Sequence, residues 1–279
     1  MKNLFYGLIT LLIVASACSK SALVEKNATL TASDNVLKSL ITTYPASLIS
    51  TPIITSSIPD AIAESQTPIN IITGKTVKFV SSMPVVHYNM IKLKSILNNL
   101  AENLKVNVDP SDTASNYVIF NGKKYDLAQF HFHYHSEHSI NGQYSTMEVH
   151  FVNISADKSY AVLGVLFNLG GRNEALGQLF HASPTVSNGV NSLNTNLNVT
   201  KLFPENIKNY YTYIGSLTTP NYGLDSDLNN GGPVTWVLYK DKQHVSSSDY
   251  NYYKGIYLEP NFRTIRPLNG RKVYENVRN

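Results

Sequence analysis

The sequence contains a single cysteine, few charged side chains and no run of basic residues. Because Cys18 is the only cysteine, no disulfide can form within the chain, and stability must come from a packed core. Charged residues make up 15% of the 279 positions, the net charge is only +4, and Lys and Arg never cluster, which argues against a nucleic-acid-binding protein. The hydrophobic share of 43% is instead typical of a globular protein.

The N-terminal segment predicts export from the cytoplasm. Residues 1–17 combine one basic residue, an apolar run from Leu4 to Ala15 that is too short to span a bilayer, and a small-x-small ending, as in a signal peptide. Cys18 follows directly, and the residues before it resemble the lipobox of bacterial lipoproteins. We therefore expect a periplasmic protein or one anchored to the cell envelope through a lipid on Cys18, with simple secretion as the alternative. Membrane contact is expected only through this anchor.

The rest of the chain divides into a tether and one β-rich domain. Residues 18–64 are rich in Ser, Thr, Ala and Ile, and three prolines interrupt regular structure there. From Ser65 onward, short alternating segments rich in Tyr, Val and Ile are divided by Gly, Asn and Pro, as in "KTVKFV", "NYVIF" and "VTWVLY". Helical patterning is weak and is found in residues 173–181 and 204–210. We predict a mainly β single domain over residues 65–279.

Histidines gather in one short stretch of this domain. The segment "QFHFHYHSEH" at residues 129–138 holds four of the eight histidines, and His150 follows twelve positions later. Asn141 and Gly142 form the strongest two-residue hairpin signal in the chain. If two strands pair around this turn, residue 140 faces 143, and His133 faces His150 about 5 Å away. His131 lies on the same face, about 6.6 Å along the strand. Three converging imidazoles are typical of a catalytic zinc site with an open fourth position.

Alternating histidines and aromatics also have a simpler explanation, because a strand between a core and a polar groove has the same pattern. A lone His-x-His would favour that explanation, whereas a third histidine in register favours metal binding. The same register places Gln129 and Glu148 on the metal face, where an amide or carboxylate can hold the outer nitrogen of a ligating imidazole. Zn²⁺ is the expected ion, and other metals that prefer imidazole remain open. A bulge between Tyr134 and His138 would shift the register.

Together these residues resemble the zinc-site hairpin of the α-type carbonic anhydrases, in the bacterial form with a short link between His-x-His and Ser-Glu-His. Further matches follow in family order between about Ser65 and Lys272: "SQTPINI", "YAVLGVLF", "YYTYIGSLTTP", "VTWVL" and "NFRTIRPLNGR". The resemblance implies one domain around a large, twisted, mostly antiparallel sheet with a few short peripheral helices and a zinc ion at the bottom of a conical cleft. It also implies a carbonate dehydratase, a zinc lyase that interconverts carbon dioxide and bicarbonate.

The resemblance implies a role for individual side chains. Thr218 would accept a hydrogen bond from the attacking solvent molecule and donate its own to Glu137, which orients the nucleophile. Carbon dioxide is apolar, so a hydrophobic wall can hold it loosely at attacking distance. The implied zinc ligands are His131, His133 and His150, which Gln129, Glu148 and the backbone carbonyl of Asn261 would orient; the implied wall is Val152, Val162, Leu217 and Trp236, with Thr219 on the polar side.

The sequence departs from the family pattern where a histidine usually carries protons to solvent. Glu102 stands at that position, or Ala101 if one residue is missing, and a carboxylate with a pKa near 4 is a poor relay at pH 7. His135, which replaces a proline of the bacterial pattern, is a second candidate relay, although an incidental surface histidine explains it as well. We therefore predict an enzyme that is limited by proton export and accelerated by imidazole. The connection at residues 221–233 is longer than the family's and is expected to overhang the cleft.

A function of another class remains open. A carbonic-anhydrase-like binding or adhesion lipoprotein with little or no catalytic activity would account for the missing proton-carrying histidine. Thr218 and Glu137 argue against it, because binding alone needs neither residue. Zinc-dependent ester hydrolysis would use the same nucleophile and is expected only as a side activity. The sequence leaves the oligomeric state open.

Overall fold

The computed structural model describes residues 65–81, 84–100, 102–218 and 232–278. The predicted signal peptide, Cys18, the tether, Thr219 and most of the 221–233 connection lie outside these residues, so what the sequence predicts for them stays a prediction. Within the described ranges, no helix is both long enough and apolar enough to cross a membrane.

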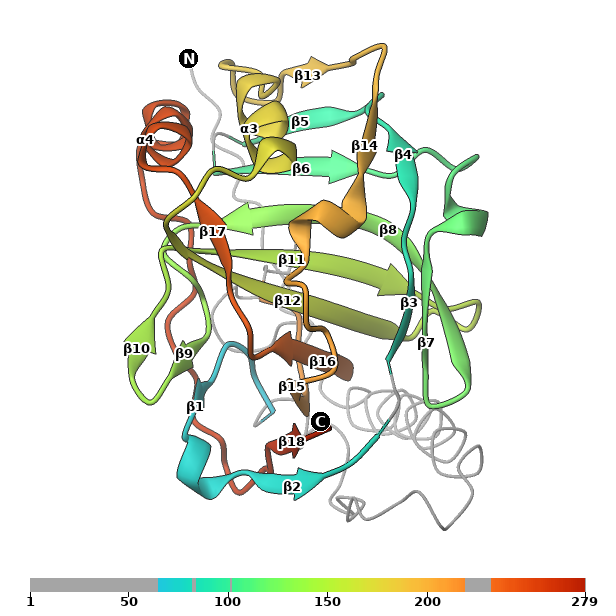
Figure 1. Cartoon of the computed structure of the whole chain (residues 1–279), viewed down its shortest axis with the longest axis vertical. Coiled ribbons are helices and arrows are strands. Elements are labelled where there is room, and N and C mark those ends of the chain that lie inside the picture. Colours follow the sequence, from blue (N-terminus) through green and yellow to red (C-terminus); the bar gives the residue numbers. More distant parts are fainter. Residues whose placement is uncertain (1–64, 82–83, 101, 219–231, 279) are drawn as a thin grey trace, which may run out of the picture. The chain divides into compact units, whose positions relative to one another are not determined.

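A sheet of 13 strands forms the centre of the described structure (Figure 1). In order across the sheet, its main path contains β13 (Val190–Asn191), β5 (Ile96–Asn99), β6 (Asn103–Asn107), β8 (Lys123–His133), β11 (Met147–Ile154), β12 (Tyr160–Leu169), β16 (Val234–Tyr239), β15 (Tyr210–Gly215), β18 (Tyr274–Asn276) and β2 (Val77–Phe79). β17 (Gln243–Val245) also pairs with β12, and β7 (Tyr117–Phe120) joins β3 (Val85–His87) to β8. Most neighbouring strands are antiparallel, whereas β16 and β17 pair with β12 in parallel, as β2 does with β18. The predicted fold class is confirmed.

Smaller elements surround this sheet. They are a sheet of β1 (Asn70–Ile71), β9 (Ser139–Ile140) and β10 (Gln143–Tyr144); the pair β4 (Met90–Lys92) and β14 (Asn196–Asn198); the α-helices α3 (Glu174–His181) and α4 (Ser247–Ile256); and the 3₁₀ turns η2 (Thr73–Lys75), η3 (Thr113–Ser115) and η4 (Val199–Leu202). α3 confirms the helix expected at 173–181, and the Asn173 side chain caps it by accepting a hydrogen bond from the Leu176 N–H.

No helix forms over residues 204–210, where the sequence pattern weakly favoured one. Tyr210 instead begins β15 and pairs with Tyr239 of β16, and both rings are buried in the core. Strand pairing and burial therefore outweigh a weak local pattern, as tertiary contacts often do.

Alternating residues of β8 and β11 face two different apolar clusters. Phe130, Phe132, Val149 and Phe151 belong to the larger cluster on one face of the sheet. The intervening positions point to the other face, where the second cluster contains Val152, Val162 and Trp236. Because both faces are covered, β11 is buried along nearly its whole length. The histidines of the two strands lie on the face of the second cluster.

The predicted register between the two histidine strands is wrong by two residues. β9 and β10 form the expected hairpin at Asn141 and Gly142, both with positive φ, and Ile140 faces Gln143. Between this hairpin and the β8–β11 ladder, one arm contains residues 134–138 and the other only 145–147. As a result His131 faces His150, and His133 faces Glu148. An even shift leaves every side chain on its predicted face of the sheet.

Candidate metal centre

Three imidazoles meet at the C-terminal end of β8 and the middle of β11. His131 and His133 come from β8 and His150 from β11, and they are 7%, 3% and 1% exposed. The ring centroids of His150 lie 5.3 Å from His131 and 4.6 Å from His133, and those of His131 and His133 are 5.0 Å apart. One nitrogen of each ring lies within 4.8 Å of one nitrogen of each other ring. The convergence expected from the sequence is present despite the corrected register.

The two histidines of β8 are held by their outer nitrogens. His131 Nδ1 donates to Gln129 Oε1 at 2.8 Å, and His133 Nδ1 donates to the Asn261 carbonyl at 2.6 Å. With the proton on Nδ1, each Nε2 carries a lone pair. Both Nε2 atoms are buried and have no hydrogen-bond partner among the described residues. Two buried acceptors that face one space without a partner fit a metal ion.

Glu148 orients the third imidazole and holds the adjacent backbone. Its Oε1 accepts from His150 Nε2 at 2.9 Å and from His138 Nδ1 at 2.7 Å, while Oε2 accepts the backbone N–H groups of Glu137 and His138, each at 2.9 Å. The proton on His150 Nε2 leaves the Nδ1 lone pair free to face the other two rings. Gln129, Asn261 and Glu148 thus accept hydrogen bonds from the outer nitrogens of His131, His133 and His150.

The protonation states favour two neutral rings. Burial holds the pKa of His131 well below its ordinary value and also lowers the pKa of His133. Burial alone would raise the pKa of the Glu148 carboxyl, but the charge and hydrogen bonds of His138 and His150 hold it well below its usual range. Burial opposes protonation of His150 as well, yet the Glu148 carboxylate outweighs it and raises the pKa of His150. A metal ion at this site would therefore displace a proton chiefly from His150.

Glu137 lies directly beside the three rings. Its Oε1 accepts the backbone N–H of Arg263 at 2.8 Å. Its Oε2 lies 3.7 Å from His133 Nε2 and 3.8 Å from His150 Nδ1, and this buried atom has no hydrogen-bond partner in the described ranges. Thr218 lines the same site, but no hydrogen bond joins it to Glu137 there. The structure brings the two residues to one site without forming the relay that the family resemblance implies.

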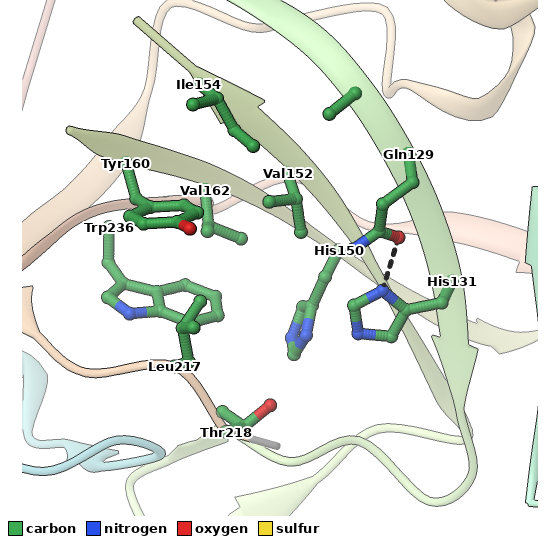
Figure 2. Close-up of a pocket in the computed structure, with 11 residues that line it drawn as sticks. Gln129, His131, His150, Val152, Ile154, Tyr160, Val162, Leu217, Thr218 and Trp236 are labelled. Atoms are coloured by element: carbon green, nitrogen blue, oxygen red, sulfur yellow. Dashed lines mark hydrogen bonds between the residues drawn. The ribbon is translucent and has the colours of Figure 1, made fainter. Parts of the chain in front are cut away.

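A pocket of about 170 Å³ opens beside the histidines. His131, His150 and Thr218 line one part of it, and Figure 2 shows the Thr218 hydroxyl directed toward the two rings. The predicted wall residues Val152, Val162, Leu217 and Trp236 all line the apolar part, together with Ala128, Ile154 and Tyr160, which the sequence motifs did not indicate. Alternation along β11 gives the missing signal, because Ile154 is two residues after Val152 and pairs with Tyr160 of β12.

The comparison with protein families identifies this arrangement. Residues 55–277 match the family model described as eukaryotic-type carbonic anhydrase. The chain belongs to this family. The resemblance drawn from the sequence motifs is therefore confirmed.

Individual relatives agree with the family assignment. The chain is 31% identical to a carbonic anhydrase of Neisseria gonorrhoeae over 215 residues, which cover 76% of this chain and 77% of that one. A carbonic anhydrase of Pectobacterium carotovorum is 30% identical over 64% of this chain and 68% of its own. Among solved structures, the α-carbonic anhydrase of Thermovibrio ammonificans in complex with the inhibitor sulfanilamide superposes with a TM-score of 0.68, at 32% identity, over 76% of this chain and 87% of that chain.

In this family member, a buried polar chain that the sequence motifs left without a role continues behind the metal site. His138 donates to Glu148 through Nδ1, and its Nε2 shares a hydrogen bond of 2.6 Å with the Tyr213 hydroxyl. Both side chains are buried, so water cannot replace them in this chain of hydrogen bonds. His138 and Tyr213 therefore help to hold the orientation of Glu148. Gly164, opposite His150, leaves the space that Glu148 needs, because a Cβ there would lie 3.1 Å from Glu148 Oε1. An isolated glycine within a strand pattern was the available signal.

The two candidate relay residues lie outside the pocket lining. Glu102 is exposed in the turn between β5 and β6. The His135 ring lies against Phe262, with ring centroids 3.8 Å apart, and against Tyr144 at 4.2 Å. Its Nδ1 donates to the Ser136 carbonyl at 2.6 Å. The half-buried His135 ring thus packs against two aromatic rings, and its role in proton transfer stays a prediction.

Proposed function

We propose that this chain catalyses the reversible hydration of carbon dioxide to bicarbonate and a proton, with a zinc ion as its cofactor. The observation that carries the proposal is the pair of buried Nε2 atoms of His131 and His133, which have no hydrogen-bond partner within the described part of the chain and face Nδ1 of His150, while protein groups hold every outer nitrogen. Membership of the carbonic anhydrase family supports the same reaction. His131, His133 and His150 would hold the metal, and neutral nitrogen ligands are those that zinc accepts.

A bound zinc ion supplies a water with a pKa of about 7 instead of 15.7, and hence a nucleophile at neutral pH. The chain's own residues direct the attack. Because the Arg263 N–H donates to one oxygen of Glu137, the second oxygen is left to accept a hydrogen bond from the Thr218 hydroxyl. A Thr218 hydroxyl that donates to Glu137 presents only its lone pairs to the attacking oxygen, which fixes the direction of that oxygen's proton.

The apolar wall provides the place for carbon dioxide. Val152, Val162 and Trp236 line the pocket beside His150, so an uncharged, apolar substrate displaces water there without losing hydrogen bonds. The wall and the histidines line one pocket, so carbon dioxide held on the wall would lie beside the residues that would hold the zinc ion.

We further propose that proton export limits the rate. The support is that Glu102, which stands where the family pattern has a proton-carrying histidine, is exposed and outside the pocket lining. Imidazole in solution has a pKa near the working pH and would take over this step.

The test is stopped-flow carbon dioxide hydration by the zinc-loaded protein, in dilute buffer and with added imidazole, beside zinc analysis. We expect about one zinc per chain, hydration above the buffer blank and acceleration by imidazole. Glu137→Gln should keep the zinc and lose roughly 100-fold in rate. Bound zinc without hydration would refute the proposal and favour the binding-lipoprotein alternative. Fast turnover in dilute buffer that does not increase with added imidazole would refute only the proposal that proton export limits the rate.

We propose that the protein acts in the cell envelope, through a lipid on Cys18 or as a free periplasmic protein. The support is the signal-peptide pattern of residues 1–17 and the lipobox-like residues before the cysteine. If Cys18 carries the lipid, labelling of cells with a radioactive fatty acid marks the wild-type chain and leaves Cys18→Ser unmarked, whereas a free periplasmic chain stays unmarked in both. Recovery of the chain mainly in the cytoplasmic fraction of lysed cells would contradict export.

A further inference from the structure

A lysine flanks the metal centre on the side away from His150. β6 pairs with β8 in antiparallel fashion, and Lys105 lies directly opposite His131, as His150 does on the other neighbouring strand. Directly opposed residues share one face of a sheet, with Cβ atoms about 5 Å apart. The row Lys105, His131, His150 therefore crosses three strands on the metal side of the sheet. The sequence motifs gave Lys105 no role.

Among the residues that the structure describes, no carboxylate forms an ion pair with Lys105. Lys92, Lys94 and Lys123 form ion pairs with aspartates at 3.1 Å or less, but none is found for Lys105 over the ranges that the structure covers. Its side chain is half-buried, so water screens it only in part. Because Lys105 lies directly opposite His131 in the β6–β8 ladder, its side chain is on the metal side of the sheet.

The two sides of the site differ in what they can recognise. The wall formed by Val152, Val162 and Trp236 has no charge and favours neutral carbon dioxide. Bicarbonate and other small monoanions carry a charge that this wall cannot hold. A cation beside His131 attracts an anion at the metal but has no charge to act on in carbon dioxide. Lys105 on β6 therefore supplies the positive charge that the apolar wall lacks.

We propose that Lys105 is a specificity-determining residue that strengthens the binding of bicarbonate and other small monoanions at the metal centre. This inference rests on the metal site of the proposed function, and it does not require the chain to be a fast enzyme. Lys105 acts through its fixed positive charge, so charge rather than shape decides the effect of a substitution.

The experiment measures anion affinity directly, without catalysis. The cobalt-substituted protein is titrated with thiocyanate, and then with bicarbonate, while its visible spectrum is recorded. Lys105→Met should bind thiocyanate about three- to tenfold more weakly, Lys105→Glu more weakly still, and Lys105→Arg like the wild type. Lys78→Met is the matched control, because Lys78 lies on β2 at the opposite edge of the same sheet.

Salt separates a charge effect from a structural one. The difference between the wild type and Lys105→Met should shrink as a salt with a non-binding anion raises the ionic strength, because ions screen the ammonium charge. A loss of packing would persist at high salt. Equal thiocyanate affinity of the wild type, Lys105→Met and Lys105→Glu would overturn the inference, as would a difference that salt does not change.

The zinc-loaded variants keep the two proposals apart. If the wild type hydrates carbon dioxide but all Lys105 variants bind anions alike, only the role of Lys105 fails. If the wild type binds cobalt and shows the charge-dependent affinity without hydration, the proposed enzyme fails and the anion site stands. A chain that takes up no cobalt would overturn both.

Discussion

Replacing Glu148 by Gln removes one charge from the most connected side chain of the site. The Glu148 carboxylate is fully buried and accepts two backbone N–H groups on one oxygen and His138 and His150 on the other. A backbone N–H can only donate a hydrogen bond, so the amide oxygen of the variant must face the two backbone groups. The NH₂ group must then face the two imidazoles. Each imidazole then has to accept, which moves its proton to the other nitrogen.

That shift affects the two rings differently. His138 can donate through Nε2 to the Tyr213 hydroxyl, which accepts as readily as it donates. His150 would instead carry its proton on Nδ1, the atom that faces His131 and His133. A metal ion must either displace this proton or move it to His150 Nε2. There the N–H would face the NH₂ group of the amide, so that two donors would oppose each other. We expect zinc affinity to fall about 10- to 100-fold, which corresponds to roughly 1.4–2.7 kcal/mol.

Zinc affinity can be measured by competition with a chromophoric chelator at pH 7.5. Glu275→Gln is the matched control, because Glu275 is also a buried carboxylate but pairs with Lys240 and lies on β18, next to the β2 edge of the sheet. The control should lose stability and keep its zinc affinity. A Glu148→Gln protein that is folded and binds zinc within about twofold of the wild type would refute the reasoning about the His150 proton.

Two further predictions follow from the same geometry. Because burial holds the pKa of His131 and His133 below 6.5, the unfolded chain binds protons that the folded, metal-free chain does not, so these two side chains lower the free energy of unfolding between pH 7.5 and 5.5, while His150, whose pKa is raised, contributes with the opposite sign. Denaturant titrations check this, and a variant with both histidines replaced by Asn that loses as much stability would contradict it. His135→Ala removes the ring that packs on Phe262, next to the Asn261 carbonyl that holds His133, and should weaken zinc binding a few-fold, by about 1 kcal/mol or less, with rescue by His135→Phe. Equal loss in both variants would exclude a packing role.

Local sequence signals are sufficient for the parts of the site that depend on alternation. The turn at Asn141 and Gly142 and the period of two along each strand are enough to place His131, His133 and His150 on one face of the sheet. The exact register cannot be predicted in this way, because the two arms between the turn and the β8–β11 pairing differ in length. The sequence of residues 134–138 does not indicate how many of them stay unpaired. The even difference preserves the face, which explains why the site prediction survived a wrong pairing.

Contacts between distant segments could not be inferred from the sequence in the same way. Lys105 is adjacent to His131 only because β6 pairs with β8, and no local pattern around β6 indicates that neighbour. Tyr213 meets His138 across the sheet for a similar reason. The role of Asn261 came from the family resemblance, since its carbonyl reaches His133 from 128 residues away. Pairing order, rather than composition, decides these contacts.

The central claim is that His131, His133 and His150 bind one metal ion and leave a position for solvent. X-ray absorption at the zinc edge of the purified, zinc-loaded protein tests it most directly. The account predicts one zinc per chain with three imidazole nitrogens at about 2.0–2.1 Å and one light ligand that is not imidazole. A zinc ion with four protein ligands, or a folded chain that binds no zinc, would contradict it.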